Sequence, residues 1–398
     1  MQWEVFSVDF ETKLKQVLLL NWGANNLCLN SRSIRDYAYF RLLKLMNIMR
    51  SCLLLFLSVF CIKISFGQEA PTNIILMIGD GTGLSQITAG MYANGNKTHL
   101  ESFPVIGLSK THSSNALVTD SAASGTAMAC GVKTLNGVIG ISMANEYRKS
   151  ILVLSKEKEY KTGLIATSSV VHATPASFYA NVISRKKYED IALQFSSSQV
   201  DYFIAGGKKH FNRRADRRNL LKEMTDWEFT SNLKAFDASP KNRVGYFTND
   251  DEPLTIREGR KPRLQAATSS MLKKLNQEDK GFFLMIEGSQ IDWGGHANDL
   301  GYIISEFKDF DEAIGEMVEF VKQHPNTLLV VTADHETGGL GLSAGNVKNF
   351  TPRGGFVTGG HTASMVPVFA MGVGAESFAG IYENTAIFDK MLAVLNKE

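Results

Sequence analysis

Residues 73–83 read NIILMIGDGTG, an uninterrupted apolar run that ends in an aspartate set among glycines. An apolar run of this length is typical of a strand that is buried on both faces of a parallel sheet. Asp80 and its neighbouring glycines fit the turn at which such a strand ends. In open α/β sheets, ligands bind beyond the carboxyl ends of the strands. This stretch therefore predicts both the fold class and the edge of the sheet where a site would lie.

Four further apolar runs have the same character, and we expect buried parallel strands at 163–167, 282–286, 327–331 and 366–371. Stretches with helical periodicity lie among them. The clearest helix is predicted at 305–322, where apolar residues follow three- and four-residue spacing and Pro325 closes the pattern. Other helices are predicted through 264–275 and 387–395. The alternation predicts a doubly wound α/β domain, with a mostly parallel central sheet and helices on both faces.

The charge balance excludes some classes of function. The 398 residues carry 42 lysines and arginines against 40 aspartates and glutamates. This balance indicates no nucleic-acid-binding module and no attraction to an acidic membrane surface. The length suits one large domain, which we place at 68–398. Within it, residues 207–262 are rich in charged and amide side chains. They could attract phosphate, but we favour a solvated insertion at the sheet edge.

Residues 45–67 have the pattern of a secretory signal peptide: Arg50, an apolar run through Phe60, and the small-residue end 65–67. A membrane anchor is the alternative, but Lys63 interrupts a run that is already short. We therefore expect an exported protein, periplasmic or extracellular, without a membrane span in its mature form. Residues 1–44 read as a mis-called start or a disordered stretch. Beyond the signal only Cys130 remains, so we expect no intrachain disulfide and a buried packing role for this cysteine.

Carboxylates and imidazoles gather at the ends of the predicted strands. Taken singly each is a weak signal, because an aspartate after a strand is usually a turn or cap residue. Taken together they would crowd like charges at one edge, which requires cations between them. Mixed Asp and His donors suit zinc, and an all-oxygen set suits magnesium. The residues concerned are Asp80, Glu287, Asp292, His296, Asp334, His335 and His361.

Ser121 is the candidate nucleophile, in the small-residue stretch TDSAASGTA at 119–127. This stretch predicts a helix whose positive N-terminal end would favour a phosphate group. The alternative is that Asp120 or Ser121 only caps the helix. Arg185 is the candidate clamp, because its planar fork matches two phosphate oxygens. A surface salt bridge is the alternative for Arg185.

Six segments, taken in chain order, resemble the motifs of the alkaline phosphatase family over about residues 71–398. They are Asp80-Gly81, Asp120-Ser121-Ala122, His172-Ala173-Thr174-Pro175, Glu287-Gly288 with Asp292 and His296, Thr332-Ala333-Asp334-His335, and Gly360-His361. The resemblance implies hydrolysis of small-molecule phosphate monoesters through a phosphoserine, without specificity for the alcohol. A phosphodiesterase of the same superfamily is the alternative, and a homodimer is left open.

The resemblance also implies two Zn²⁺ and one Mg²⁺. One zinc would be held by Asp292, His296 and His361, and the other by Asp80, Asp334 and His335 next to Ser121. Magnesium would be held by Asp80, Thr174 and Glu287, and Arg185 would bind phosphate. Two positions depart from the best-known bacterial members, with His172 in place of Asp and Trp293 in place of Lys. Both border the magnesium and phosphate sites, so we expect them to contact the substrate and to weaken phosphate retention.

Overall fold

The computed structural model describes residues 39–50, 73–276 and 280–396. Internal contacts divide the chain into two units, Met1–Gln68 and Glu69–Glu398. In the first unit, the described residues form a helix at 39–50. Most of the predicted signal peptide, 45–67, lies outside the described residues. None of the described helices combines the length and the apolar character needed to cross a membrane.

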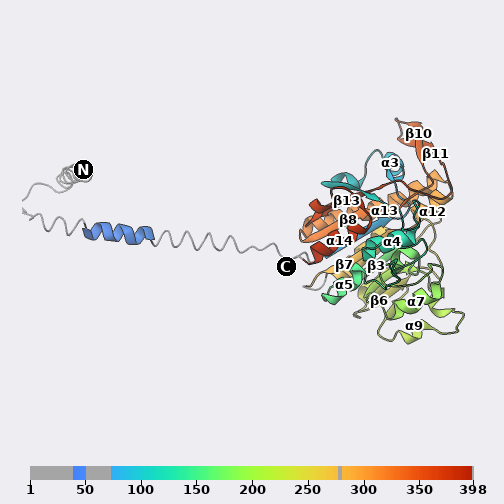
Figure 1. Ribbon diagram of the computed structural model, residues 1–398, viewed down its shortest axis with the longest axis horizontal. Coiled ribbons are helices and arrows are strands. Elements are labelled where there is room, and N and C mark those ends of the chain that lie inside the picture. Colours follow the sequence, from blue (N-terminus) through green and yellow to red (C-terminus); the bar gives the residue numbers. More distant parts are fainter. Residues whose placement is uncertain (1–38, 51–72, 277–279, 397–398) are drawn as a thin grey trace, which may run out of the picture. The chain divides into compact units, whose positions relative to one another are not determined.

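A ten-stranded sheet forms the centre of the second unit, in the order β14-β2-β13-β8-β1-β7-β3-β4-β6-β5 (Figure 1). Strand β1 lies inside the sheet, and all seven of its residues are buried, as its apolar sequence requires. Most neighbouring strands are parallel, which confirms the predicted fold class. The strands are β1 (Asn73–Gly79), β2 (Val105–Lys110), β3 (Lys161–Ser169), β4 (Tyr202–Gly206), β5 (Glu228–Thr230), β6 (Val244–Phe247), β7 (Phe282–Gly288), β8 (Thr327–Thr332), β13 (Val366–Gly372) and β14 (Gly380–Glu383).

Helices cover both faces of the sheet, as predicted. Along β1, Ile74, Leu76 and Ile78 join the core shared with α4, α5 and α14, whereas Ile75 and Met77 join the core shared with α3, α11 and α13. Alternate side chains of a strand point to opposite faces, so each face carries its own apolar layer. The helices are α3 (Leu84–Ala93), α4 (Ser121–Cys130), α5 (Ile151–Glu157), α6 (Ala173–Ala176), α7 (Tyr188–Ser196), α8 (Lys209–Asn212), α9 (Leu220–Glu223), α10 (Leu233–Ala238), α11 (Leu264–Leu275), α12 (Gln290–His296), α13 (Leu300–Gln323) and α14 (Thr385–Leu395), with short 3₁₀ helices at His99–Ser102 and Ala375–Phe378.

Strand β13 corrects one prediction. We expected a parallel strand at 366–371, but β13 pairs antiparallel with both β8 and β2. Its apolar sequence indicates burial on both faces, and a strand can be buried in this way whether it pairs parallel or antiparallel. The connection decides the direction, since a parallel neighbour needs a crossover, usually through a helix, that returns the chain to the starting end of the previous strand. Between β8 and β13 the chain instead forms β9 (Glu336–Thr337), the hairpin of β10 (Gly341–Asn346) with β11 (Thr351–Gly355), and β12 (His361–Thr362).

The segment 207–262 lies at the sheet edge, where we predicted an insertion, but it is more than a solvated loop. It supplies the two outermost strands, β6 and β5, together with α8, α9 and α10. Its Trp227 and Phe247 are buried against Phe203 of β4. Several of its charged side chains pair with one another, as in the ion pair of Arg218 with Glu223. This pairing favours the insertion over a phosphate-attracting surface.

Candidate active site and metal centre

Three parallel strands bring three carboxylates to one edge of the sheet. In the register of β7, β1 and β8, Ile78 is level with Glu287 on one side and with Thr332 on the other. Asp80 and Asp334 each follow two residues later, so they emerge at the same edge as Glu287. All three carboxylates have no exposed surface. Their charges would repel one another strongly unless cations lie between them.

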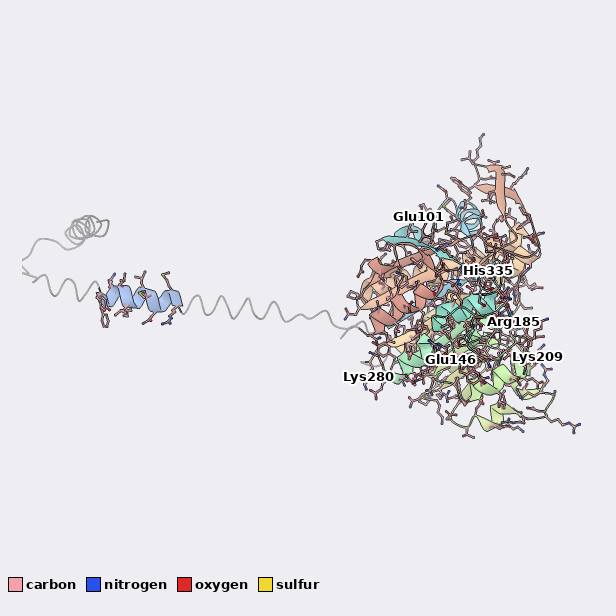
Figure 2. The ribbon with its side chains drawn as sticks, in the orientation of Figure 1. Glu101, Glu146, Arg185, Lys209, Lys280 and His335 are labelled. Carbon is pink, nitrogen blue, oxygen red and sulfur yellow. The ribbon has the colours of Figure 1, made fainter. Side chains whose placement is uncertain are left out.

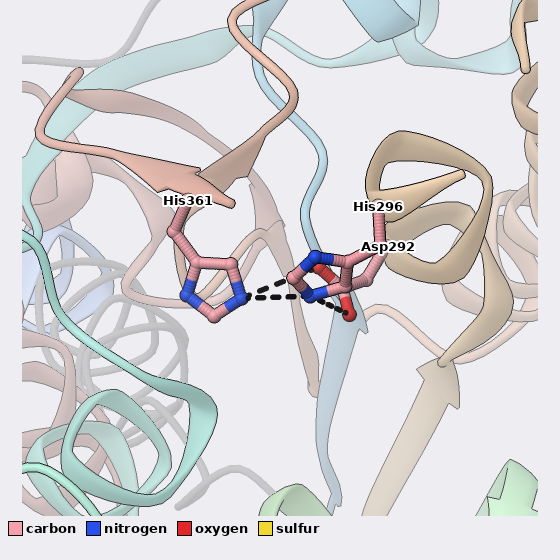
Figure 3. A group of neighbouring side chains, drawn as sticks. All are labelled: Asp292, His296 and His361. Atoms are coloured by element: carbon pink, nitrogen blue, oxygen red, sulfur yellow. Dashed lines mark hydrogen bonds and ion pairs between the residues drawn. The ribbon is translucent and has the colours of Figure 1, made fainter. Parts of the chain in front are cut away.

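Asp292, His296 and His361 form the first group that could hold a metal ion (Figure 3). Nε2 of His296 lies 3.3 Å from Asp292 Oδ2 and 3.2 Å from Nε2 of His361. Nδ1 of His296 lies 2.7 Å from the carbonyl of Gly359, and Nδ1 of His361 lies 2.8 Å from that of Thr119. A carbonyl can only accept, so both Nδ1 atoms carry the proton. Two Nε2 atoms and a carboxylate are therefore directed at one point, where either a proton or a metal ion can lie.

Asp80, Asp334 and His335 form the second group. Nε2 of His335 lies 3.1 Å from Asp334 Oδ2 and 3.6 Å from Asp80 Oδ1. The Thr337 hydroxyl donates to Asp292 Oδ1 at 2.5 Å and lies 3.2 Å from Nδ1 of His335. Since the single Thr337 proton goes to the carboxylate, Nδ1 of His335 must donate to Thr337. Thr337 thus turns the Nε2 lone pair of His335 towards the carboxylates and links the two groups.

The third group combines Asp80, His172 and Glu287. Thr174, which we predicted here, is buried on α6 and lies close enough to lower the pKa of Glu287. Both oxygens of Asp80, Oε1 of Glu287, Oγ1 of Thr174 and Nδ1 of His172 are buried without a geometric hydrogen-bond partner. Such atoms are rare in folded proteins, so this concentration fits bound cations. His172 was predicted beside the substrate, and its ring is also placed to act as a ligand.

Burial sets the direction of the pKa shift at Asp80, Glu287 and His172. Burial, followed by the neighbouring carboxylates, raises the pKa of Asp80 well above its usual value. Burial likewise raises the pKa of Glu287 to about 7. The carboxyl groups of Asp80 and Glu287 would therefore hold protons unless nearby positive charge favours their ionised form. The low-polarity surroundings of its ring, and next the charge of Arg185, lower the pKa of His172 to about 4, so this imidazole is neutral near pH 7.

In the first group, His296 and Asp292 share a proton. The hydrogen bond to Asp292 raises the pKa of His296 to about 9. Burial alone would raise the pKa of Asp292, but that hydrogen bond and the nearby imidazoles hold it well below its usual value. This proton occupies the place that a metal ion would take, so metal binding here should release a proton.

Ser121 begins α4, with its side chain directed at the second group. Its Oγ lies 3.3 Å from Nε2 of His335, and the residue is buried. The preceding residue, Asp120, caps α4, because its Oδ1 accepts from the N–H of Ala123 at 3.0 Å. Ser121 is therefore not needed as a cap, and it lies at the positive end of the helix.

Arg185 forms a salt bridge, which was the alternative that we gave to phosphate binding. This salt bridge does not lie on the surface. Nη1 of Arg185 donates to Asp120 Oδ2 at 3.1 Å, and both side chains are mostly buried. Burial acts to lower the pKa of Arg185, but Asp120 raises it, so the guanidinium stays charged. Figure 2 labels Arg185 and His335 in the region of α4. Because a guanidinium has five donors, anchoring to Asp120 leaves it able to bind an oxyanion beside Ser121.

His172 and Trp293, which we expected to depart from the bacterial pattern, lie together. The rings of His172 and Trp293 meet edge to face, with centroids 6.2 Å apart and an interplanar angle of 72°. Trp293 also lies on α12, next to Asp292. The pair therefore borders both the first and the third group.

Sequence reasoning did not single out Gln86, Glu336 or Thr337. Thr337 orients His335, and Gln86 with Glu336 forms a buried hydrogen bond next to it. Their roles depend on the pairing of β9 with β12, and strands of two residues leave no periodic signal. The sequence offered one indication that these residues contribute to the site, because Glu336 and Thr337 directly follow Asp334 and His335.

Comparison with known proteins gives a consistent result. Residues 71–354 match the family model described as alkaline phosphatase. Alkaline phosphatase 3 of Bacillus subtilis (strain 168) is 32% identical, covering 82% of this chain and 90% of its own length. Alkaline phosphatase 4 of the same organism is 39% identical, covering 70% of this chain and 64% of its own length.

Solved structures of alkaline phosphatases are also similar to this chain. The alkaline phosphatase from the Antarctic bacterium TAB5 has 42% identity and a TM-score of 0.78, covering 82% of this chain and 98% of that one. A variant of the TAB5 protein, with one histidine replaced by aspartate, was solved with magnesium bound in a site called M3. It is 41% identical, with a TM-score of 0.77, and covers the same shares of the two chains.

Proposed function

This chain belongs to the alkaline phosphatase family and hydrolyses phosphate monoesters, and from that premise we propose that Ser121 is its nucleophile, in a site that holds two zinc ions and one magnesium ion. The observation that carries the proposal is the placement of Ser121 Oγ, 3.3 Å from Nε2 of His335, which belongs to the second candidate metal group. A hydroxyl at a helix N-terminus next to cations is suited to attack a phosphate dianion.

The donor chemistry suggests which ion belongs where. The first and second groups each mix carboxylate with imidazole, which suits zinc. In the third group Asp80, Glu287 and Thr174 offer only oxygen, which suits magnesium. His172 adds a neutral nitrogen there, and we propose that it weakens the preference for magnesium. The variant TAB5 structure with magnesium in its M3 site motivates this assignment for a related protein.

The charges of the site would match a phosphate monoester. Asp80, Glu287, Asp292 and Asp334 carry four negative charges, which three divalent cations would exceed by two. With Arg185 the resulting surplus complements a phosphate dianion. When bound, the metal ions lower the pKa of nearby hydroxyl groups and neutralise charge on the attacking and leaving oxygens.

The reaction takes place in two displacements. Ser121 Oγ attacks phosphorus and gives up its proton, while the bond from phosphorus to the alcohol oxygen breaks and the alcohol leaves protonated. Water then attacks the phosphoserine, Oγ of Ser121 leaves and regains a proton, and inorganic phosphate is released. Arg185 holds the phosphate oxygens throughout, and Asp120 fixes the direction of its fork. Trp293 and His172 border the space around the phosphate.

The test is substitution of Ser121 with alanine. We expect Ser121→Ala to bind the same amount of zinc and to lose at least about 1,000-fold in kcat. The matched control is Ser114→Ala, at an exposed serine, which should leave kcat unchanged. Acid quenching during turnover of a ³²P-labelled monoester should trap label on wild type and not on Ser121→Ala. Retained monoesterase activity in Ser121→Ala would refute the assignment, and a diester of the same alcohol tests the alternative activity.

We also propose that the protein is exported, on the basis of the signal pattern at 45–67. The mature enzyme would then act in the periplasm or outside the cell. There, phosphate monoesters would be its small-molecule substrates.

A further inference from the structure

The Glu336 carboxylate lies beside the metal groups without belonging to any of them. Its Oε1 accepts from Gln86 Nε2 at 2.6 Å and from the N–H of Leu340 at 3.2 Å. Its Oε2 accepts from Thr362 Oγ1 at 2.5 Å and from the N–H of Gly339 at 3.2 Å. A buried carboxylate is costly unless it is hydrogen-bonded, and here both oxygens are bonded twice. All four partners are donors, so the site is built for a carboxylate.

Glu336 and Thr362, which are hydrogen-bonded to each other, are each next in sequence to a histidine of a candidate metal group. Glu336 follows His335, and Thr362 follows His361. In the antiparallel pair of β9 with β12, Thr362 is also the register partner of Glu336. Strands of two residues are too short to hold their register through backbone bonds alone. The side-chain bond of Thr362 to Glu336 therefore fixes how the segment with His361 lies against the segment with His335.

Gln86 connects the same carboxylate to the segment that carries Asp80. It lies in the first turn of α3, which begins four residues after Asp80. Its Nε2 also donates to the carbonyl of Thr337 at 2.8 Å, and its Oε1 accepts from the N–H of Gly83 at 3.1 Å. The packing is tight, because a Cβ added at Gly83 would lie 2.5 Å from Glu336 Cγ. Three segments that are distant in sequence are thus joined through one side chain.

We propose that Glu336 is a positioning residue for both zinc sites, acting with Gln86 and Thr362 to hold His335 and His361 in ligating geometry. This inference rests on the proposed function. Buried hydrogen-bond partners that orient ligands typically contribute 10–100-fold to metal affinity. Glu336 would do so through its neighbours in the chain rather than through a bond to an imidazole.

A merely structural role predicts something different. If Glu336 only stabilises the fold, its loss lowers the melting temperature equally in chelated and zinc-loaded protein. If it positions ligands, the loss falls mainly on the increment in melting temperature that zinc provides, because a distorted site binds zinc less tightly.

The experiment uses two nearly isosteric substitutions and one that restores the hydroxyl. Glu336→Gln places an amide NH₂ against donors, and Thr362→Val removes the hydroxyl, whereas Thr362→Ser keeps it. Zinc affinity is measured by competition with a chromophoric chelator, melting temperature with and without zinc, and ligand geometry by the visible absorption of the Co²⁺-loaded protein. We expect zinc affinity to fall about 10–100-fold in Glu336→Gln and Thr362→Val. Thr362→Ser should lie near wild type.

The outcomes separate this inference from the proposed function. A wild-type protein that takes up no zinc would refute the metal centre itself. A zinc-binding wild type beside unchanged affinity in Thr362→Val and Glu336→Gln would overturn the positioning role alone. Equal losses of melting temperature with and without zinc would also overturn it. A weakened zinc increment together with an altered Co²⁺ spectrum, restored in Thr362→Ser, would support it.

Discussion

In the function that we propose, His172 and Trp293 determine how much charge surrounds the phosphate. The pKa of His172 is lowered to about 4, so the imidazole adds no charge near neutral pH. Trp293 offers one N–H and no positive charge. Both residues were singled out from the sequence as departures from the bacterial pattern. The resemblance placed His172 at the border of the magnesium site but not as a possible ligand beside Asp80 and Glu287, because that depends on how the start of α6 lies against β1 and β7.

The double substitution His172→Asp with Trp293→Lys should tighten inhibition by inorganic phosphate several-fold. The new carboxylate would favour magnesium, and the new ammonium group would contact phosphate directly. The measurement is the phosphate inhibition constant at fixed pH with saturating zinc and magnesium, with each single variant as a control. Inhibition that is equal to or weaker than that of wild type would mean that the two side chains only pack the wall of the pocket.

At the scale of elements, the strands that hold the candidate ligands could be predicted well. Apolar runs at 73–78, 282–286 and 327–331 correspond to β1, β7 and β8, because a strand buried on both faces needs an unbroken apolar sequence. The direction of β13 could not be predicted, since burial does not encode it. The same holds for β9 and β12, which are too short for periodicity and are joined by the side-chain hydrogen bond from Thr362 to Glu336.

Helix α3 packs on α13 through a glycine, and this contact should be sensitive to a single methyl group. A Cβ at Gly90 would lie 2.0 Å from Cδ1 of Phe307, a buried core ring. Alanine is favoured over glycine within a helix by about 1 kcal/mol, but overpacking of this kind costs about 1–3 kcal/mol. We expect Gly90→Ala to lower the melting temperature by a few degrees. In the control Gly341→Ala, an added Cβ meets no atom within 4 Å, and equal melting of the two variants would contradict the packing argument.

The second unit carries every candidate site residue, and within the first unit we propose residues 45–67 as an export signal. Mature protein should begin near Gln68, because 65–67 end the signal pattern. N-terminal sequencing of secreted protein measures this. Leu54→Arg is the control, since a charge in the apolar run should block export. Secreted material that retains residues before Met49 would show that the assumed start of the signal is wrong.

Stability of the second unit should depend on its metal ions. Cys130 is a free, buried cysteine among the residues that the structure describes, so covalent crosslinks do not offset the repulsion of the clustered carboxylates. Chelation should lower the melting temperature and abolish activity together.

The size of that chelation effect should depend on pH. In metal-free protein, burial raises the pKa of Glu287 from 4.5 to about 7, so the folded chain keeps a proton that the unfolded chain has already released between these values. The stability of the metal-free protein therefore falls as pH rises through this window. The pKa of His296, raised from 6.5 to about 9, acts in the same direction at higher pH. Bound metal replaces these protons, so the melting temperatures of loaded and chelated protein should diverge by several degrees between about pH 5 and pH 7.5. Differential scanning calorimetry across this range measures the divergence. In Glu287→Gln the chelated protein should show a flatter dependence on pH, and parallel curves for loaded and chelated wild type would rule out the buried carboxylates as the cause.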